Sequence, residues 1–179
     1  MFALARRSLA ALLCLTIVST AMAADRPTRI AFVDTGNTGR SVTSEALALD
    51  GVRKGNLNIQ VISRAVDLNP YNLVPEANAE ALLKQRGIDV SAHRAAPLTA
   101  ADIKYSDLIL TATTRHKELI IAAFPAAAAK THTMAEYATG TSVDIDDAFG
   151  KDMAFYEHVL GQIESYMPAV LTKAASLSK

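Results

Sequence analysis

The sequence predicts an α/β fold: a doubly wound sheet of about four parallel strands with helices on both faces. Three observations support this class. Strand-like and helix-like segments alternate along the chain. The first and third strand-like segments contain continuous apolar runs, as expected of central parallel strands buried on both faces. A glycine-punctuated loop joins the first strand to a helix, which is where ligands bind in such folds.

The expected strands are short and bounded by turn residues. They span residues 28–33, 58–63, 106–112 and, more weakly, 131–136. Helices are expected at 44–52, 75–87, 114–124 and 151–175, with a loop at 137–150 before the last one. Pro75 and Gly87 are typical of the two ends of the second helix. The last helix carries a core-facing stripe of apolar residues at helical spacing: Phe155, Val159, Ile163, Met167 and Val170.

The first 23 residues differ in composition from the rest. Arg6 and Arg7 precede an apolar run, and the segment ends in the small-x-small pattern of residues 21–23. This is the pattern of a secretory signal peptide, and its apolar run is shorter than the roughly 20 residues of a transmembrane helix. We therefore expect a signal peptide at 1–23, one domain at 24–179, and export to the periplasm or outside the cell. The alternative is an uncleaved anchor.

Cleavage after Ala23 would leave 156 of the 179 residues, enough for one domain with a sizeable core. It removes Arg6 and Arg7 from 18 basic residues and leaves all 18 acidic ones, so the net charge becomes −2. Such a balance argues against nucleic-acid binding and against a basic membrane-binding surface. Cys14 is the only cysteine and leaves with the signal peptide. The exported protein would therefore have neither a disulfide nor a thiolate nucleophile.

The loop after the first strand, residues 34–41, reads DTGNTGRS. Gly36 and Gly39 allow the backbone to turn its N–H groups inward as an anion-binding nest. Ser41 begins the helix, whose positive dipole end faces the same hollow. Arg40 adds a guanidinium that matches phosphate geometry. The nucleotide-binding pattern G-x-x-x-x-G-K-[ST] is absent.

Residues 33–41 resemble the signature V-C-x-G-N-x-C-R-S of the low-molecular-weight protein tyrosine phosphatases, which share their fold with some arsenate reductases. Segments 87–99 and 106–120 also resemble family segments. Residues 144–150, DIDDAFG, are similar to the family's acid loop, D-x-x-D-P-[FY]-G. The similar segments follow one another in the family's order, which implies the same fold with a phosphatase-type anion loop after the first strand.

The resemblance implies a role for each matching residue. Asp34 occupies the position of the nucleophilic cysteine, Arg40 that of the phosphoryl clamp, and Asp147 that of the general acid. Ala148 replaces the proline that usually follows this acid, and Phe149 matches an aromatic residue that lines the entrance. The implied anion-binding loop consists of Thr35, Gly36, Asn37, Thr38, Gly39, Arg40 and Ser41. In that loop Asn37 is the brace, Ser41 supports the nucleophile, and Gly39 stands where the family often has a second cysteine.

An aspartate cannot form the phosphocysteine of the family reaction. Its carboxylate oxygens reach one atom further than a cysteine sulfur and would crowd a bound phosphate. Two like unit charges about 4 Å apart repel by roughly 4 kcal/mol at an effective dielectric of about 20. Asp34 is then either a built-in anion that closes the nest together with Arg40, or a protonated acid that donates a hydrogen bond to phosphate. The sequence leaves both open.

Other candidate ligands are weaker. Asp144, Asp146 and Asp147, with Asp34 across the cleft, offer oxygen atoms that Mg²⁺ or Ca²⁺ accepts, but Asp144 and Asp146 are better explained as solvated loop carboxylates. We expect no resident metal and no cofactor. The histidines lack metal-ligand spacing and are expected to be structural or at the surface: His93, His116, His132 and His158.

The expected function is that of an exported pseudophosphatase whose anion-type pocket serves binding or regulation. Its expected ligand is a small anion or a phosphorylated molecule, and no protein partner is indicated. The alternative is an active phosphomonoesterase or tyrosine phosphatase-like hydrolase that uses Asp34, with or without a metal, and Asp147 as general acid. A third hypothesis is a structural role with an unused pocket.

Overall fold

The computed structural model describes residues 26–177, so the expected signal peptide lies outside the described residues. Four parallel strands form one sheet in the order β2-β1-β3-β4, which confirms the predicted fold class. The strands are β1 (Thr28–Asp34), β2 (Ile59–Ala65), β3 (Leu108–Thr111) and β4 (Thr131–Thr133). Because β1 pairs with both β2 and β3, it lies inside the sheet, as its apolar run predicted.

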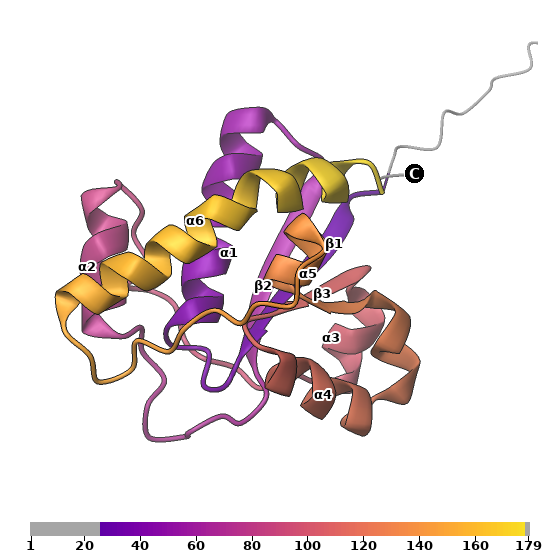
Figure 1. The fold of residues 1–179 in the computed structure, drawn as a ribbon, viewed down its shortest axis with the longest axis horizontal. Coiled ribbons are helices and arrows are strands. Elements are labelled where there is room, and N and C mark those ends of the chain that lie inside the picture. Colours follow the sequence, from indigo (N-terminus) through magenta and orange to yellow (C-terminus); the bar gives the residue numbers. More distant parts are fainter. Residues whose placement is uncertain (1–25, 178–179) are drawn as a thin grey trace, which may run out of the picture.

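Helices cover both faces of the sheet (Figure 1). One face packs against α1 (Arg40–Gly55), α2 (Ala77–Gln85), α5 (Met134–Thr139) and α6 (Met153–Ala175). The opposite face packs against α3 (Ala100–Tyr105), α4 (Thr114–Ala123) and the 3-10 helix η1 (Pro125–Lys130). No described helix combines the length and apolarity needed to cross a membrane.

The two cores follow from the alternation of side chains along the strands. Ile30 and Phe32 of β1 face α6, where they meet Ile163 and Val170 in the larger core. Ala31 and Val33 point to the other side, toward Ile103, Ile120 and Ala127. Of the predicted stripe on α6, Val159, Ile163, Met167 and Val170 are buried, while Phe155 is partly buried.

Two predicted boundaries were wrong. The segment 131–136 is a strand only as far as Thr133, because Thr133 caps α5 and exchanges capping-box hydrogen bonds with Glu136. Helix α1 begins at Arg40, four residues before the expected helical segment 44–52 and next to Ser41, which was expected to begin the helix; residues 34–39 of the loop therefore lead directly into its N-terminus. Helix α3 was not predicted at all, although Thr99 and Asp102 form a second capping box at its start.

This topology positions the site. In a parallel sheet, the carboxyl ends of all strands open at one edge. At this edge β1 ends in Asp34, β2 leads into residues 66–76, and the acid loop pairs back to β3, since Ile145 N donates to Ala112 O at 2.9 Å. Three loops from distant parts of the sequence therefore surround the N-terminus of α1.

Candidate active site

The loop between β1 and α1 is held by the segment that follows β2. Asp67 N donates to Thr35 O at 2.9 Å, and Glu76 N donates to Thr38 O at 2.9 Å. A further bond joins Val66 N to Asp34 O, also at 2.9 Å. The loop is thus fixed by three backbone hydrogen bonds to the segment that follows β2.

Asn37 braces the loop from behind. Its backbone has a φ of 58°, in the left-handed region that asparagine tolerates. The side chain is fully buried; Nδ2 donates to Ser41 Oγ at 2.9 Å and to Ser63 Oγ at 2.8 Å. Its Oδ1 accepts from Ala96 N at 3.0 Å. These hydrogen bonds are of the kind that the bracing role implied by the resemblance requires. Neither Asn37 nor Ser41 lines the cavity, because both lie behind the loop.

The carboxylate of Asp34 lies inside the loop and is only 3% exposed. One oxygen, Oδ1, accepts from Asn37 N at 2.5 Å, and Oδ2 accepts from Ser41 N at 2.8 Å. The loop therefore already directs two of its amides, including one at the N-terminus of α1, at an anion of the protein's own. The amides of Gly36, Thr38, Gly39 and Arg40 have no hydrogen-bond partner within residues 26–177.

Arg40 joins the loop to the acid loop. Its side chain is 9% exposed, and Nη2 pairs with Asp147 Oδ2 at 3.0 Å. Nη1 donates to Ile145 O at 3.2 Å. The side chain of Asp147 is 60% exposed, so this ion pair closes the outer side of the site while remaining in contact with solvent. The predicted clamp and the predicted general acid are thus bound to each other.

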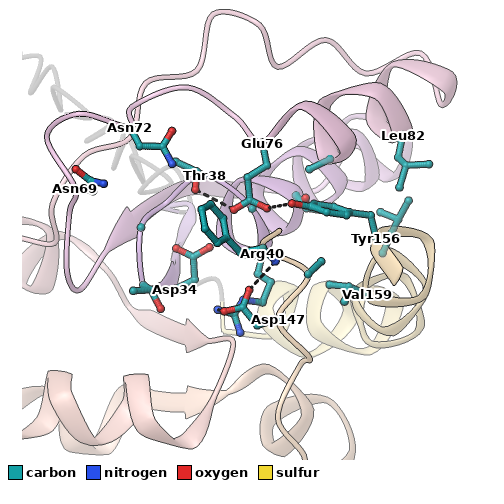
Figure 2. A pocket seen from close by; sticks show the side chains of 18 of the residues that line it. Asp34, Thr38, Arg40, Asn69, Asn72, Glu76, Leu82, Asp147, Tyr156 and Val159 are labelled. Carbon is teal, nitrogen blue, oxygen red and sulfur yellow. Dashed lines mark hydrogen bonds and ion pairs between the residues drawn. The ribbon is translucent and has the colours of Figure 1, made fainter. Parts of the chain in front are cut away.

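A cavity of about 310 Å³ opens over the loop (Figure 2). The structure brings the following predicted site residues to its wall: Asp34, Thr35, Gly36, Thr38, Gly39, Arg40, Asp147 and Phe149. Phe149 is 64% exposed and lies at the outer part of the site. On the inner side the wall is largely apolar and comes from α2 and α6, with Ala79, Leu82, Val159 and Leu160.

Glu76, which no sequence pattern indicated, also lines this cavity and lies between Thr38 and Tyr156 (Figure 2). Its Oε1 accepts from Thr38 Oγ1 at 3.0 Å, and its Oε2 accepts from Tyr156 Oη at 2.7 Å. Burial raises the pKa of Glu76, and the nearby carboxylates Asp34 and Asp147 raise it further, against the lowering effect of its two hydrogen bonds. No local signal marks this glutamate, because its partner Tyr156 lies 80 residues away in the sequence.

Two of the four histidines also contact the loop. His116, buried at the start of α4, shares a 2.9 Å hydrogen bond between Nε2 and Thr35 Oγ1. Its Nδ1 lies 3.0 Å from Oγ1 of Thr113, the residue that caps α4. Burial lowers the pKa of His116, and the nearby Arg40 lowers it further. His93 Nε2 hydrogen-bonds to Asn37 O at 2.9 Å. Both side chains support the loop from outside the cavity.

The aspartates weighed as metal ligands have other partners. Asp144 accepts from the N and Oγ1 atoms of Thr114, and Asp146 bonds to His158 and Gln162. Asp147 pairs with Arg40. Within the described part of the chain, no three His, Cys, Asp or Glu side chains are grouped to hold a metal ion. The structure therefore does not bring these carboxylates together as a site.

Comparisons with known proteins agree with this architecture. Residues 29–179 match the family described as low molecular weight phosphotyrosine protein phosphatase. A protein-arginine-phosphatase of Geobacillus stearothermophilus is 33% identical over 147 residues, which is 82% of this chain and 96% of that protein. A probable low molecular weight protein-tyrosine-phosphatase, EpsP, of Ralstonia solanacearum is 32% identical over 79% of this chain and 92% of its own length.

Among solved structures, the chain is similar to the YwlE arginine phosphatase, in a cysteine-to-serine mutant with a phosphorylated active-site serine. The TM-score is 0.78 at 31% identity, covering 82% of this chain and 95% of that one. The family match over residues 29–179 and this structural likeness lead to one conclusion. The chain belongs to the low molecular weight phosphotyrosine protein phosphatase family.

Proposed function

We propose that this protein is an exported, catalytically silent member of its family, which uses the cavity for binding and not for hydrolysis. One observation carries the proposal: both carboxylate oxygens of Asp34 accept hydrogen bonds from loop amides, at 2.5 Å from Asn37 N and 2.8 Å from Ser41 N. A carboxylate held in this way occupies donors that a phosphate would need, and it repels a second anion.

The chemistry of the site supports the absence of catalytic activity in two further ways. The family's thiolate is the nucleophile that takes the phosphoryl group, and we propose that Asp34 stands in its place. Arg40, which was expected to bind the phosphoryl group, already donates hydrogen bonds to Asp147 and to Ile145 O. Asp147, which was expected to act as the general acid, is engaged in the same ion pair. A substrate phosphate would have to displace Asp147 and also overcome the charge of Asp34.

A second candidate is an enzyme with Asp34 as an oxygen nucleophile. The phosphorylated active-site serine of the YwlE mutant favours it, since an oxygen at that protein's active site carries a phosphoryl group. In this chain an attack by Asp34 would form an acyl phosphate. That step first requires one carboxylate oxygen to leave its amide donor, so we place this candidate second.

Hydrolysis of an aryl phosphate by residues 24–179, with and without Mg²⁺, tests the proposal. The wild type should show no turnover above background in either condition. Asp34→Cys should gain metal-independent turnover, because it supplies a thiol and removes the charge of Asp34, which leaves only the Arg40–Asp147 pair for a substrate phosphate to open. Asp34→Asn is the matched control and should stay inactive.

Two results would contradict the proposal. Metal-independent turnover by the wild type would overturn the silence of the site. Turnover that requires Mg²⁺ and is lost in Asp34→Asn would establish Asp34 as a nucleophile and move the enzyme hypothesis to first place.

Export is the other part of the proposal, and it rests on the sequence pattern of residues 1–23. It also gives a reason for a site without a thiol, since a reactive thiolate is readily oxidised outside the cytoplasm. Protein isolated from cells should begin at Ala24 and should not react with thiol-alkylating reagents. Recovery of the chain with an intact Met1 from the cytoplasm would contradict export.

A further inference from the structure

The charge of the cavity wall has the opposite sign to the one that a phosphate site needs. Among the residues that line it, four carry carboxylates and one carries a guanidinium. The carboxylates belong to Asp34, Asp67, Glu76 and Asp147, and the guanidinium to Arg40. Arg40 is already paired with Asp147. The cavity therefore contains no unpaired positive side chain among its lining residues, and it has an excess of negative charge.

The shape of the cavity is that of a ligand site with a polar end and an apolar end. Its volume of about 310 Å³ lies at the lower end of the range for small-molecule pockets, roughly 300–1,000 Å³. Apolar side chains from α2 and α6, Leu82 and Val159 among them, line one end beside the ring of Tyr156 (Figure 2). Glu76 lies between this apolar end and the loop, with Asp34 and Asp147 on the loop side (Figure 2).

We propose that the cavity binds a small organic cation, an alkyl- or arylalkylammonium, with its ammonium group on Glu76 and its apolar body against α2 and α6. This inference rests on the proposed binding function and names the chemical class of the ligand. The cavity defines the site, and its carboxylates define the charge of the ligand.

Glu76 has capacity for such a ligand. A carboxylate offers about four acceptor positions, and the structure fills one on each oxygen, with Thr38 Oγ1 and Tyr156 Oη. The remaining positions suit an ammonium group, which has donors and no acceptor. The aromatic ring of Tyr156, which lines the same cavity, adds a favourable surface for a cation.

A small anion fits the same wall less well. It would meet the free N–H groups of Gly36, Thr38, Gly39 and Arg40, which are neutral donors, but it would also face the charges of Asp34 and Glu76. Glu76 lies directly over the loop: a Cβ built on Gly39 would come within 2.8 Å of both of its carboxylate oxygens. An anion seated on the loop would therefore be in close contact with a carboxylate.

The affinity for the cation should also depend on pH, because Glu76 titrates. Burial, Asp34 and Asp147 raise its pKa, while the hydrogen bonds from Tyr156 and Thr38 oppose this. A bound cation favours the ionised carboxylate, so cation affinity should increase as the pH rises through the pKa of Glu76. The other charged groups that line the same cavity are the carboxylates of Asp34, Asp67 and Asp147 and the guanidinium of Arg40.

The test compares two probes with the same apolar body and opposite charge: benzylammonium and benzylphosphonate. Calorimetry at pH 7.5 on residues 24–179 should show benzylammonium binding at least about tenfold more tightly than benzylphosphonate. Glu76→Gln should weaken benzylammonium at least about fivefold. Glu80→Gln, which removes the same charge from the same helix outside the cavity wall, should leave the affinity unchanged. Thermal unfolding of each variant checks that it folds, and Asp67→Asn replaces Glu76→Gln if that variant does not.

Tighter binding of benzylphosphonate than of benzylammonium by the wild type would overturn the inference. Equal loss in Glu76→Gln and Glu80→Gln would overturn the assignment of the ammonium group to Glu76. Neither result restores hydrolysis, so the aryl-phosphate assay judges the proposed catalytic silence separately.

Discussion

At the scale of the residue, Asp34 holds the loop through two hydrogen bonds, and in the proposed function it also blocks it. Its carboxylate accepts from Asn37 N and Ser41 N, so it satisfies two donors that would otherwise be buried without a partner. The same position places a negative charge where the loop would receive an anion. Stability of the loop and binding of an external anion are therefore in competition at this residue.

Asp34→Asn should separate the two effects. A carboxamide has one oxygen, so it accepts from one of the two amides and leaves the other unsatisfied. We expect a loss of about 1 kcal/mol in the free energy of unfolding, or roughly 2–4 °C in Tm. Phosphate or sulfate should then bind at least about tenfold more tightly than to the wild type, which corresponds to about 1.4 kcal/mol. Thermal shift with increasing anion concentration measures both changes.

The control adds Arg40→Ala to Asp34→Asn, which should abolish the gain in anion affinity because the guanidinium is lost. Tight phosphate binding by the wild type at neutral pH, with no gain in Asp34→Asn, would contradict the built-in anion. It would favour instead a protonated Asp34 that donates to the phosphate.

At this scale the sequence predicted the residues that adjoin one another in the chain and missed those that do not. Asp34 to Ser41 form a continuous motif whose residue types have direct physical meaning. Glu76 and Tyr156 have no motif, and their hydrogen bond depends on the packing of α2 against α6. Contacts between distant segments of this kind cannot be read from spacing.

At the scale of the element, α4 supports the loop through its first turn. Thr113 caps the helix, and His116 bridges from that cap to Thr35. Arg40, Asp34, Asp144 and Asp147 all influence this imidazole, and burial together with Arg40 gives it a lowered pKa. A neutral His116 is therefore part of the folded arrangement.

The contribution of His116 to stability should consequently fall on acidification. The unfolded chain takes up a proton at the usual histidine pKa of about 6.5, before the folded chain does. The contribution of His116 to the free energy of unfolding is fully present above about pH 6.5. It is lost as the pH falls from there to the pKa of His116 in the folded state, with a slope of at most about 1.4 kcal/mol per pH unit. Urea unfolding from pH 7.5 to 5 should show the wild type losing stability relative to His116→Gln as the pH falls. His158→Gln, at an exposed histidine, controls for the loss of one imidazole. An unchanged slope in His116→Gln would contradict the assignment.

The elements themselves were predicted where their patterns are strong. Long periodic helices and apolar strands were recognised, whereas the short helices α3 and α5 were missed although each begins with a threonine capping box. The box T-x-x-[DE] was present in the sequence at Thr99 and Thr133. A three-residue strand running directly into a helix, as β4 into α5, leaves too few residues for periodicity to separate the two.

At the scale of the whole molecule, Glu76 joins three parts of the fold. It is the N-cap residue of α2, it accepts from Thr38 in the loop, and it accepts from Tyr156 of α6. The fold class was predictable because alternating strands and helices allow few topologies. The charge inside the cavity was not predictable, because it depends on which carboxylates the loops bring together.

The raised pKa of Glu76 predicts a pH-dependent effect on global stability. Folding favours the protonated form of Glu76. The contribution of Glu76 to the free energy of unfolding is therefore fully present below its pKa of 4.5 in the unfolded chain, and it is lost as the pH rises through its pKa in the folded chain. Glu76→Gln should therefore become more stable relative to the wild type between pH 4.5 and pH 7.5, as measured by urea unfolding at both values. Glu80→Gln should show no such change. A difference between Glu76→Gln and wild type that is the same at both pH values would contradict the prediction.

The close approach of Gly39 and Glu76 restricts how this site can change. Any side chain at position 39 would place its Cβ about 2.8 Å from the Glu76 carboxylate, which would have to move and give up its bonds to Thr38 and Tyr156. Substitutions at positions 39 and 76 are therefore coupled, so the order in which the two arise matters.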